Sequence, residues 1–196
     1  MGDVNQRIFL ERLVPQADGP VLEIGSKDYG NTTSFRDLYG GSEYVGVDLE
    51  AGKGVDRVVD LTSGLGDLAP GSFALAICCS VLEHTPQPWV MAQNITRLLR
   101  PQGQLYVAVP WVWRYHAYPD DYFRFSPRGI TALFPAIDWL KATYSTTVTG
   151  EHIELNLLDI REVDNRMAEH AQTPGGLRKY LPYLQVNMLG RKTRAD

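Results

Sequence analysis

Residues 21–30 read VLEIGSKDYG, and this short stretch decides the fold class. The first four residues have the length and composition of a buried strand, and a glycine follows them directly. The next six nearly spell the dinucleotide-binding pattern G-x-G-x-x-G, with Gly25 and Gly30 in place but Lys27 at the middle glycine. A strand followed by such a loop predicts a ligand-binding site at the carboxyl end of the strand.

The rest of the sequence alternates between strand-like and helix-like patterns. Strands are predicted at 21–25, 44–48, 55–61, 73–81, 104–110, 139–148 and 185–192. Helices are predicted at 3–14, 31–39, 87–100, 127–134 and 155–170. This alternation indicates an α/β fold built on an open, mostly parallel sheet. We expect one domain over residues 1–196, with an insertion at about 150–184 before the last strand.

Composition and charge narrow the partners and the location. The net charge is −4 and no basic run occurs before the last few residues, which argues against nucleic acid as the main substrate. The sequence has no twenty-residue apolar run and no basic-then-apolar start, so we expect no membrane span and a cytoplasmic location. The two cysteines, Cys78 and Cys79, are adjacent in an apolar run and do not have the spacing of a zinc site, so no metal is predicted.

Lys27 and Asp48 indicate what kind of ligand the first loop accepts. The middle glycine of a dinucleotide site lets the backbone touch the pyrophosphate, and a lysine there makes that approach harder. Asp48 ends the run YVGVD at a spacing from Gly25 near that of a ribose-binding acid, although an acid there can equally form a turn or cap a helix. A carboxylate can accept from both ribose hydroxyls. Together these residues predict a nucleoside-like cofactor without a pyrophosphate.

Several segments in a fixed order now resemble one family. VLEIGSKDYG is similar to the first motif of the class I S-adenosylmethionine-dependent methyltransferases, and specifically to their small type 11 domain. YVGVDLEAGKGVDRVVDL resembles the next two segments, FALAICCSVLEH the fourth motif, and ITRLLRPQGQLYVAVP the helix, turn and fifth strand. The resemblance covers roughly residues 20–135 and departs from the family where Ser26, Lys27 and Asp28 replace the inner glycines.

The resemblance implies a Rossmann-like, seven-stranded sheet whose last strand is antiparallel, with helices on both faces and S-adenosyl-L-methionine as the cofactor. Glu23 and Gly25 would hold the amino-acid end of the cofactor. The altered residues after Gly25 either narrow the loop or direct Lys27 to the carboxylate of the cofactor's methionine part. Asp48 would bind the ribose. The full set of cofactor-binding residues implied is Glu23, Gly25, Ser26, Lys27, Asp48, Leu49, Asp60, Leu61 and Ser80. Leu49 and Leu61 are also compatible with a plain core role.

The loop WVWRYHAYPDDYFRFSP, residues 111–127, follows the fifth strand at the ligand end of the sheet. Its aromatic residues with a few interleaved polar groups suit an acceptor pocket. The candidate substrate-binding residues are Trp113, Asp121, Tyr122 and Arg124, and the candidate bases are His84 and His116. The alternative is a structural lid in which Asp121 pairs with Arg124 and His84 bonds a backbone carbonyl.

We therefore expect a methyltransferase that acts on a small-molecule acceptor, with O-, N- and C-methylation all open and a homodimer as one arrangement. Methyl transfer depends mainly on positioning, so the sequence need not carry a motif for a base. A non-catalytic module of the same fold is the main alternative, because the first motif is altered. An NAD-dependent oxidoreductase is disfavoured by Lys27.

Overall fold

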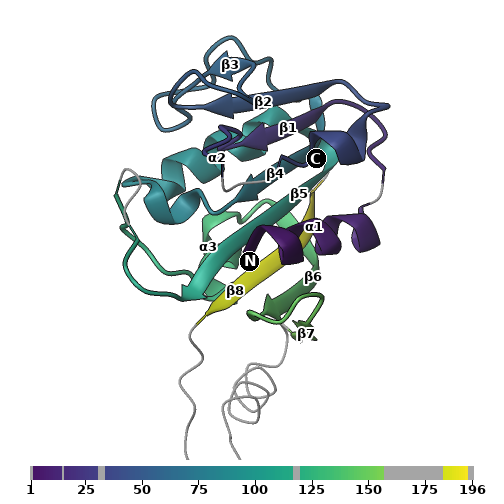
Figure 1. The fold of residues 1–196 in the computed structure, drawn as a ribbon. Helices are drawn as coiled ribbons and strands as arrows, with labels where there is room; N and C mark the ends of the chain where they lie inside the picture. The colour runs from purple at the N-terminus through teal and green to yellow at the C-terminus, as the bar shows by residue number, and fades with distance from the viewer. Residues whose placement is uncertain (1, 15, 31–33, 117–119, 157–182, 194–196) are drawn as a thin grey trace, which may run out of the picture.

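The computed structural model describes residues 2–14, 16–30, 34–116, 120–156 and 183–193, and these form one sheet with helices on both faces (Figure 1). The strands are β1 (Val21–Ile24), β2 (Tyr44–Asp48), β3 (Arg57–Val58), β4 (Phe73–Cys79), β5 (Leu99–Val112), β6 (Ile137–Ser145), β7 (His152–Glu154) and β8 (Leu184–Lys192). The helices are α1 (Gly2–Leu13), α2 (Pro88–Leu98) and α3 (Pro127–Leu133), with short 3-10 turns η1 (Arg36–Tyr39) and η2 (Leu82–His84).

The strand order is β3-β2-β1-β4-β5-β8-β6-β7. The first five strands are parallel, and β8 is antiparallel to both of its neighbours, β5 and β6. The predicted fold class is thereby confirmed, including the antiparallel last strand. The sheet has eight strands instead of seven because residues 152–154, inside the predicted insertion, pair with β6 as an edge strand.

Two predicted elements are much shorter in the described residues than expected, and a third lies almost wholly outside those residues. Strand 55–61 is reduced to β3 because the carboxylate of Asp60 accepts the Thr62 N–H at 2.8 Å and turns the chain. The helix expected at 31–39 is described only as the turn η1 at its end. The helix expected at 155–170 lies almost wholly outside the described residues.

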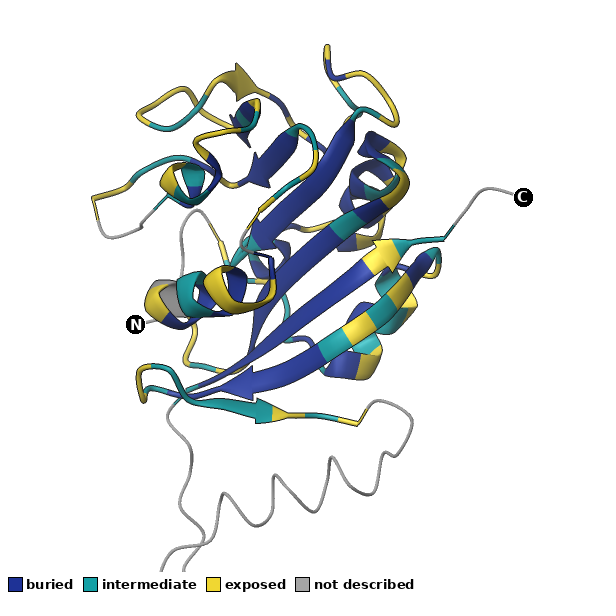
Figure 2. Ribbon diagram, turned by 90° about the vertical axis from the view of Figure 1, so that its right-hand side faces the viewer, coloured by how far each residue is buried: buried dark blue, intermediate teal, exposed yellow. Residues whose placement is uncertain are grey.

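Alternating side chains of the central strands build one core on each face of the sheet. Leu22, Cys78 and Val107 belong to the core under α2 and α3. Their neighbours Val21, Ile77 and Tyr106 belong to the core under α1, where Phe9 stacks on Tyr106 with ring centroids 4.8 Å apart. Figure 2 shows that the central strands are buried along nearly their whole length. A period of two in the sequence therefore separates the two cores.

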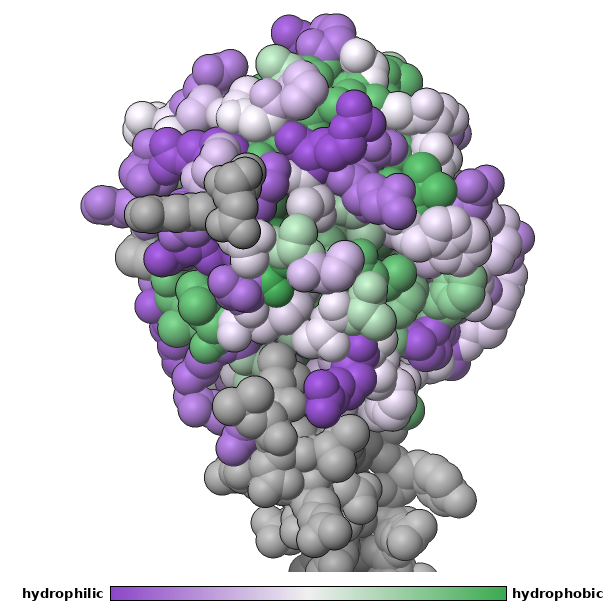
Figure 3. Space-filling model, turned by 180° about the vertical axis from the view of Figure 1, so that it is seen from behind, coloured by the Kyte–Doolittle hydropathy of each residue, from purple (hydrophilic) through white to green (hydrophobic). Residues whose placement is uncertain are grey.

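The outer face of the α2 and α3 side, seen in Figure 3, mixes hydrophilic and apolar side chains. Among the described residues, no helix is both long enough and apolar enough to cross a bilayer.

The turn after β1 depends on Gly25. Its φ is +74°, a left-handed conformation that residues with a Cβ rarely adopt. A Cβ added there would lie 2.3 Å from Cγ2 of Val81, which follows β4. The Gly25 N–H donates to the Val47 carbonyl at 2.9 Å and so fixes the same turn against β2. Three strands of the sheet therefore meet at a position where only glycine fits.

Replacing Gly25 by alanine should lower the free energy of unfolding by about 2–4 kcal/mol, because strain at positive φ and overpacking against Val81 add. Gly30→Ala is the matched control for conformation, since Gly30 also has a positive φ of +84° but a Cβ there has no neighbour within 4 Å. Gly30→Ala should lower the free energy of unfolding by about 1–2 kcal/mol. Urea denaturation checks both, and equal losses in the two variants would contradict the close packing on Val81.

Candidate functional site

A cleft of about 790 Å³ opens at the carboxyl ends of β1, β2 and β4. This is the edge of a parallel α/β sheet at which ligands bind, and the volume suits a cofactor-sized molecule. Its walls come from the loop after β1, the end of β2, the segment after β4, α1 and the loop after β5. Its lining includes Gln6, Glu23, Gly25, Lys27, Asp48, Leu49, Glu50, Leu61, Ser80, Val81, Glu83, His84, Trp113 and His116.

The charged side chains of the lining are mostly acidic. Four carboxylates face the cleft, those of Glu23, Asp48, Glu50 and Glu83. Among the described lining residues the one lysine is Lys27, and its Nζ donates to Glu50 at 2.6 Å. A phosphate group would be repelled by this set, whereas a cationic ligand would be attracted. The cleft therefore fits a positively charged ligand better than a phosphorylated one.

Glu23 is the most deeply placed acid of the first motif. It is 6% exposed, and its carboxylate accepts from the Tyr44 hydroxyl at 2.8 Å and from Ser34 Oγ at 3.2 Å. Burial raises the pKa of Glu23 to about 6, against the opposing effect of these hydrogen bonds. A cationic group beside Glu23 would favour its ionised form and so be bound more tightly.

Asp48 and Lys27 lie next to each other on the ribose side of the predicted site. The Lys27 backbone N–H donates to Asp48 Oδ2 at 3.1 Å, which holds the carboxylate at the cleft. The Lys27 ammonium is drawn to Glu50 and lies 5.0 Å from the centre of the Tyr29 ring. The structure thus places this ammonium at the end of β2, paired with Glu50.

The other predicted cofactor residues divide between the cleft and its surroundings. Leu49 lies on the cleft and is 54% exposed, which excludes the plain core role, while Leu61 lines the cleft from the core. Ser26 is buried beside Gly46 and does not line the cleft. The Asp60 carboxylate is also outside the lining, because Thr62 and Ser63 donate to it.

Ser80 lies where the chain leaves β4, with a φ of +54°. Gln6 Nε2 from α1 donates to its Oγ at 3.2 Å, and Gln185 Nε2 from β8 does so at 3.4 Å. These bonds hold the hydroxyl group on the cleft, under the position expected for the cofactor. They also make α1 part of the wall, so Gln6 is a lining residue that no sequence motif revealed.

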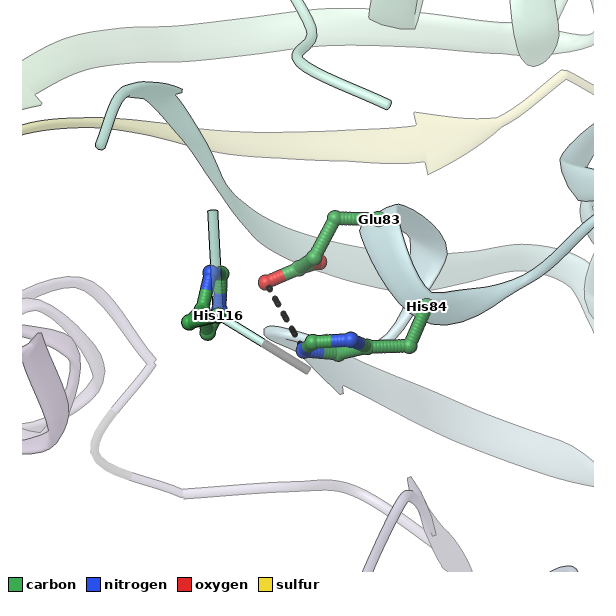
Figure 4. Close-up of side chains that lie close together, drawn as sticks. All are labelled: Glu83, His84 and His116. Carbon is green, nitrogen blue, oxygen red and sulfur yellow. Dashed lines mark ion pairs between the residues drawn. The ribbon is translucent and has the colours of Figure 1, made fainter. Parts of the chain in front are cut away.

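Glu83, His84 and His116 form a cluster at the other end of the cleft (Figure 4). The Glu83 side chain is fully buried, and Nε2 of His84 lies 3.9 Å from its Oε1. The rings of His84 and His116 meet edge to face with centroids 4.8 Å apart. Burial raises the pKa of Glu83 to about 8 and lowers the pKa of His84. The two predicted bases are thus brought together, with a glutamate that the sequence reasoning did not single out.

The loop after β5 is fastened beside this cluster by Asp121 and Arg124. Arg124 donates to both oxygens of Asp121, at 2.5 and 2.7 Å, and also to the carbonyls of Trp113 and Arg114. Asp121 in turn accepts the His116 N–H at 2.8 Å. Neither Asp121, Tyr122 nor Arg124 lines the cleft, whereas Trp113 does. These contacts support the lid interpretation of the Asp121–Arg124 pair.

The strand order, the antiparallel last strand and the cleft together define a Rossmann-like fold of the class I methyltransferase type. The family profile described as "Methyltransferase domain" matches residues 22–107. Residues 22–107 are accordingly a type 11 methyltransferase domain of the class I S-adenosylmethionine-dependent methyltransferases. The resemblance seen in the sequence is confirmed.

Two curated relatives carry the name ubiquinone biosynthesis O-methyltransferase. The protein of Xanthomonas euvesicatoria pv. vesicatoria (strain 85-10) is 37% identical over 60 residues, which are 31% of this chain and 25% of that protein. The protein of Idiomarina loihiensis (strain ATCC BAA-735 / DSM 15497 / L2-TR) is 31% identical over 58 residues, or 30% and 24%. The matched region spans about a quarter of the length of these relatives.

Solved structures share the fold at low identity. The 1,6-didemethyltoxoflavin-N1-methyltransferase of Burkholderia thailandensis, with 1,6-didemethyltoxoflavin and S-adenosylhomocysteine bound, has a TM-score of 0.63 and 15% identity. That match covers 97% of this chain and 78% of the other. A SAM-dependent methyltransferase from Archaeoglobus fulgidus has a TM-score of 0.62 and 14% identity, with coverages of 95% and 93%. At these identities the comparison shows the fold.

The raised pKa of Glu23 predicts a pH-dependent stability. Between the ordinary pKa near 4.5 and the folded value of about 6, the folded state binds more protons than the unfolded state. The contribution of Glu23 is therefore fully present below pH 4.5 and falls by about 2 kcal/mol as the pH rises through 6. Glu23→Gln does not titrate and should lose this dependence.

Chemical denaturation at pH 4.5 and pH 7 measures the effect as the stability difference between Glu23→Gln and the wild type. Relative to the wild type, Glu23→Gln should be more stable at pH 7 than at pH 4.5 by about 2 kcal/mol. Asp67→Asn, which removes an exposed carboxylate outside the cleft, is the control for the loss of a negative charge. A difference independent of pH would refute the raised pKa of Glu23.

Proposed function

We propose that the protein is an S-adenosylmethionine-dependent methyltransferase acting on a small-molecule acceptor. The observation that carries the proposal is the acid-lined cleft, in which the Gly25 turn lies between the carboxylates of Glu23 and Asp48. S-adenosylmethionine bears two positive groups, a ribose and no phosphate. The residues present therefore fit this cofactor, and the matching family profile supports the same activity.

The proposed roles follow the position of each group in the cleft. Glu23 and the Gly25 backbone bind the amino-acid end, and Asp48 accepts from the ribose hydroxyls. Leu49 and Leu61 border the adenine, and the Ser80 hydroxyl lies under the cofactor. When bound, S-adenosylmethionine supplies an electrophilic methyl group on its sulfonium. The sulfur departs as a neutral thioether, and this departure needs no acid catalysis.

The acceptor side is assigned to the far end of the cleft, where His84, His116 and Trp113 lie. His84 Nδ1 lies 2.6 Å from the Asp120 carbonyl, which can only accept, so this nitrogen carries the proton and Nε2 keeps its lone pair. We assign Nε2 of His84 as the group that receives a proton from an acceptor O–H or N–H. The lowered pKa of His84 keeps that lone pair available at neutral pH.

The likeness to the ubiquinone biosynthesis O-methyltransferases supports a hydroxyl-bearing acceptor, and the Trp113 ring supports an aromatic or other planar one. We also propose that the chain acts as one domain, to which the insertion at about 150–184 contributes acceptor contacts.

Isothermal titration with S-adenosylhomocysteine tests the cofactor assignment. Asp48→Asn should weaken binding by about tenfold or more, because a hydrogen bond from a hydroxyl to a charged acceptor is replaced by a weaker one. Asp60→Asn tests the other carboxylate that the family resemblance implies. This variant should lose less affinity for S-adenosylhomocysteine, because the Asp60 carboxylate already accepts hydrogen bonds from Thr62 and Ser63. Asp67→Asn is the control and should bind as the wild type does.

The proposal fails if the wild type binds neither S-adenosylhomocysteine nor S-adenosylmethionine at high micromolar concentration. Binding without any methylated product from a panel of phenolic and other hydroxylated acceptors would favour a non-catalytic module of the same fold.

A further inference from the structure

The cluster of Glu83, His84 and His116 contains more than a proton acceptor needs. One ligand-type atom from each residue lies within 4.8 Å of the other two. Both carboxylate oxygens of Glu83 are buried, and neither has a hydrogen-bond partner among the described residues. A buried carboxylate without partners is costly, because its desolvation is not compensated. The arrangement therefore lacks a positively charged or donating group at its centre.

The hydrogen bonds of the two imidazoles determine which atoms face that centre. His84 Nδ1 lies 2.6 Å from the Asp120 carbonyl oxygen. His116 Nδ1 lies 3.1 Å from Asp121 Oδ2 and 3.3 Å from the Arg114 carbonyl oxygen. All three partners are acceptors, so Nδ1 of each ring must be the donor and Nε2 of each ring keeps a lone pair. Nε2 of His84 thus faces Oε1 of Glu83 at 3.9 Å, and one ring nitrogen of His116 lies within 4.8 Å of both ligand atoms.

The surrounding contacts resemble the outer shell of a metal site. A metal-binding histidine ordinarily donates its second ring N–H to a carbonyl or a carboxylate, and here one histidine does each. The carboxylate that orients His116 is itself fixed by Arg124 at 2.5 and 2.7 Å. The carbonyl that orients His84 belongs to the same loop, which is tied to η2 where Tyr122 N–H donates to the Glu83 carbonyl at 2.7 Å. The ligand atoms are therefore held in place before any ion arrives.

We propose that Glu83, His84 and His116 form a binding site for one divalent transition-metal ion, with its remaining coordination positions open to the cleft. Two imidazole nitrogens and one carboxylate suit Zn²⁺, Fe²⁺, Mn²⁺ or Co²⁺. Mg²⁺ and Ca²⁺ prefer oxygen ligands and fit this set less well. No sequence motif indicates this site, because its ligands come from two segments more than thirty residues apart.

The open positions face the end of the cleft assigned to the acceptor, so the proposed role of the ion rests on the proposed function. An acceptor hydroxyl bound to the ion would have its pKa lowered and would be oriented as the nucleophile. With the ion bound, Nε2 of His84 would be a ligand in place of the proton acceptor assigned above, and the acceptor proton would leave to solvent on binding. Metal binding itself does not depend on methyl transfer.

The test is a calorimetric titration of the full-length, metal-depleted protein with Zn²⁺. We expect one ion per chain, with affinity reduced at least 100-fold in Glu83→Gln and in His116→Gln, because each variant removes one of three protein ligands. Asp121→Asn removes no ligand and should weaken binding by about 10–100-fold. His152→Gln, whose imidazole does not line the cleft, is the matched control and should bind as the wild type does.

Thermal unfolding of each variant establishes that it is folded before the titration is interpreted. Failure of the wild type to bind one Zn²⁺, or equal affinity in Glu83→Gln, His116→Gln and His152→Gln, would overturn the metal site. S-adenosylhomocysteine is titrated into the same samples. Retained cofactor binding without metal binding would reject only this inference, whereas loss of cofactor binding with retained metal binding would reject only the proposed function.

Discussion

The packing of Gly25 against Val81 is the constraint on which the site depends. It brings the end of β1 against the chain that leaves β4, at a distance that admits no side chain between them. The hydrogen bond from Gly25 to Val47 adds the end of β2 to the same point. Glu23, Asp48 and Ser80 are thereby placed around one cleft, although they lie far apart in the sequence. The first motif is a packing requirement as well as the proposed binding loop.

The altered first motif keeps this packing while changing what surrounds it. Lys27 adds a positive charge beside Asp48, but its ammonium is neutralised by Glu50. The backbone N–H of Lys27 donates a hydrogen bond to the Asp48 carboxylate, and this bond needs no particular side chain at position 27. The lost inner glycines therefore leave the acidic character of the cleft intact. These carboxylates repel a ligand with phosphates and attract a cationic ligand.

The two ends of the cleft differ in chemistry. At the first-motif end, hydrogen bonds from Tyr44 and Ser34 to Glu23 oppose the effect of burial, which still raises the pKa of Glu23 to about 6. At the end near η2, the Glu83 carboxyl oxygens have no hydrogen-bond partner among the described residues, and Nε2 of His84 lies 3.9 Å from one of them. This division matches the needs of methyl transfer, in which one partner is a cation and the other must lose a proton or bind an ion.

The fold could be predicted from the sequence because short apolar runs such as VLEI and FALAIC, bounded by turn residues, alternate along the chain with helix-like segments. The carboxyl-end position of Glu23, Gly25 and Asp48 followed from the same pattern. Side-chain directions did not, because they depend on local turns. Ser26 is turned toward Gly46, and Asp60 is turned back on Thr62 and Ser63.

The burial of Glu83 could not be predicted from the sequence either. This residue stands beside His84 in the quoted SVLEH run, but an acid there reads as an exposed residue of a short turn. Its burial follows from the loop of residues 111–127, which lies over η2 and donates two backbone N–H groups to the Glu83 carbonyl. The position of Gln6 on the cleft could not be predicted for a similar reason, because its contact with Ser80 joins residues 74 positions apart.

The most direct measurement of the central claim compares ligands of different charge for the same cleft. Equilibrium competition between S-adenosylmethionine, ATP and NADH should show saturable binding of the first and none of the phosphorylated nucleotides at comparable concentrations. The preference follows from the carboxylates around Gly25. Tighter binding of ATP or NADH than of S-adenosylmethionine would contradict the account.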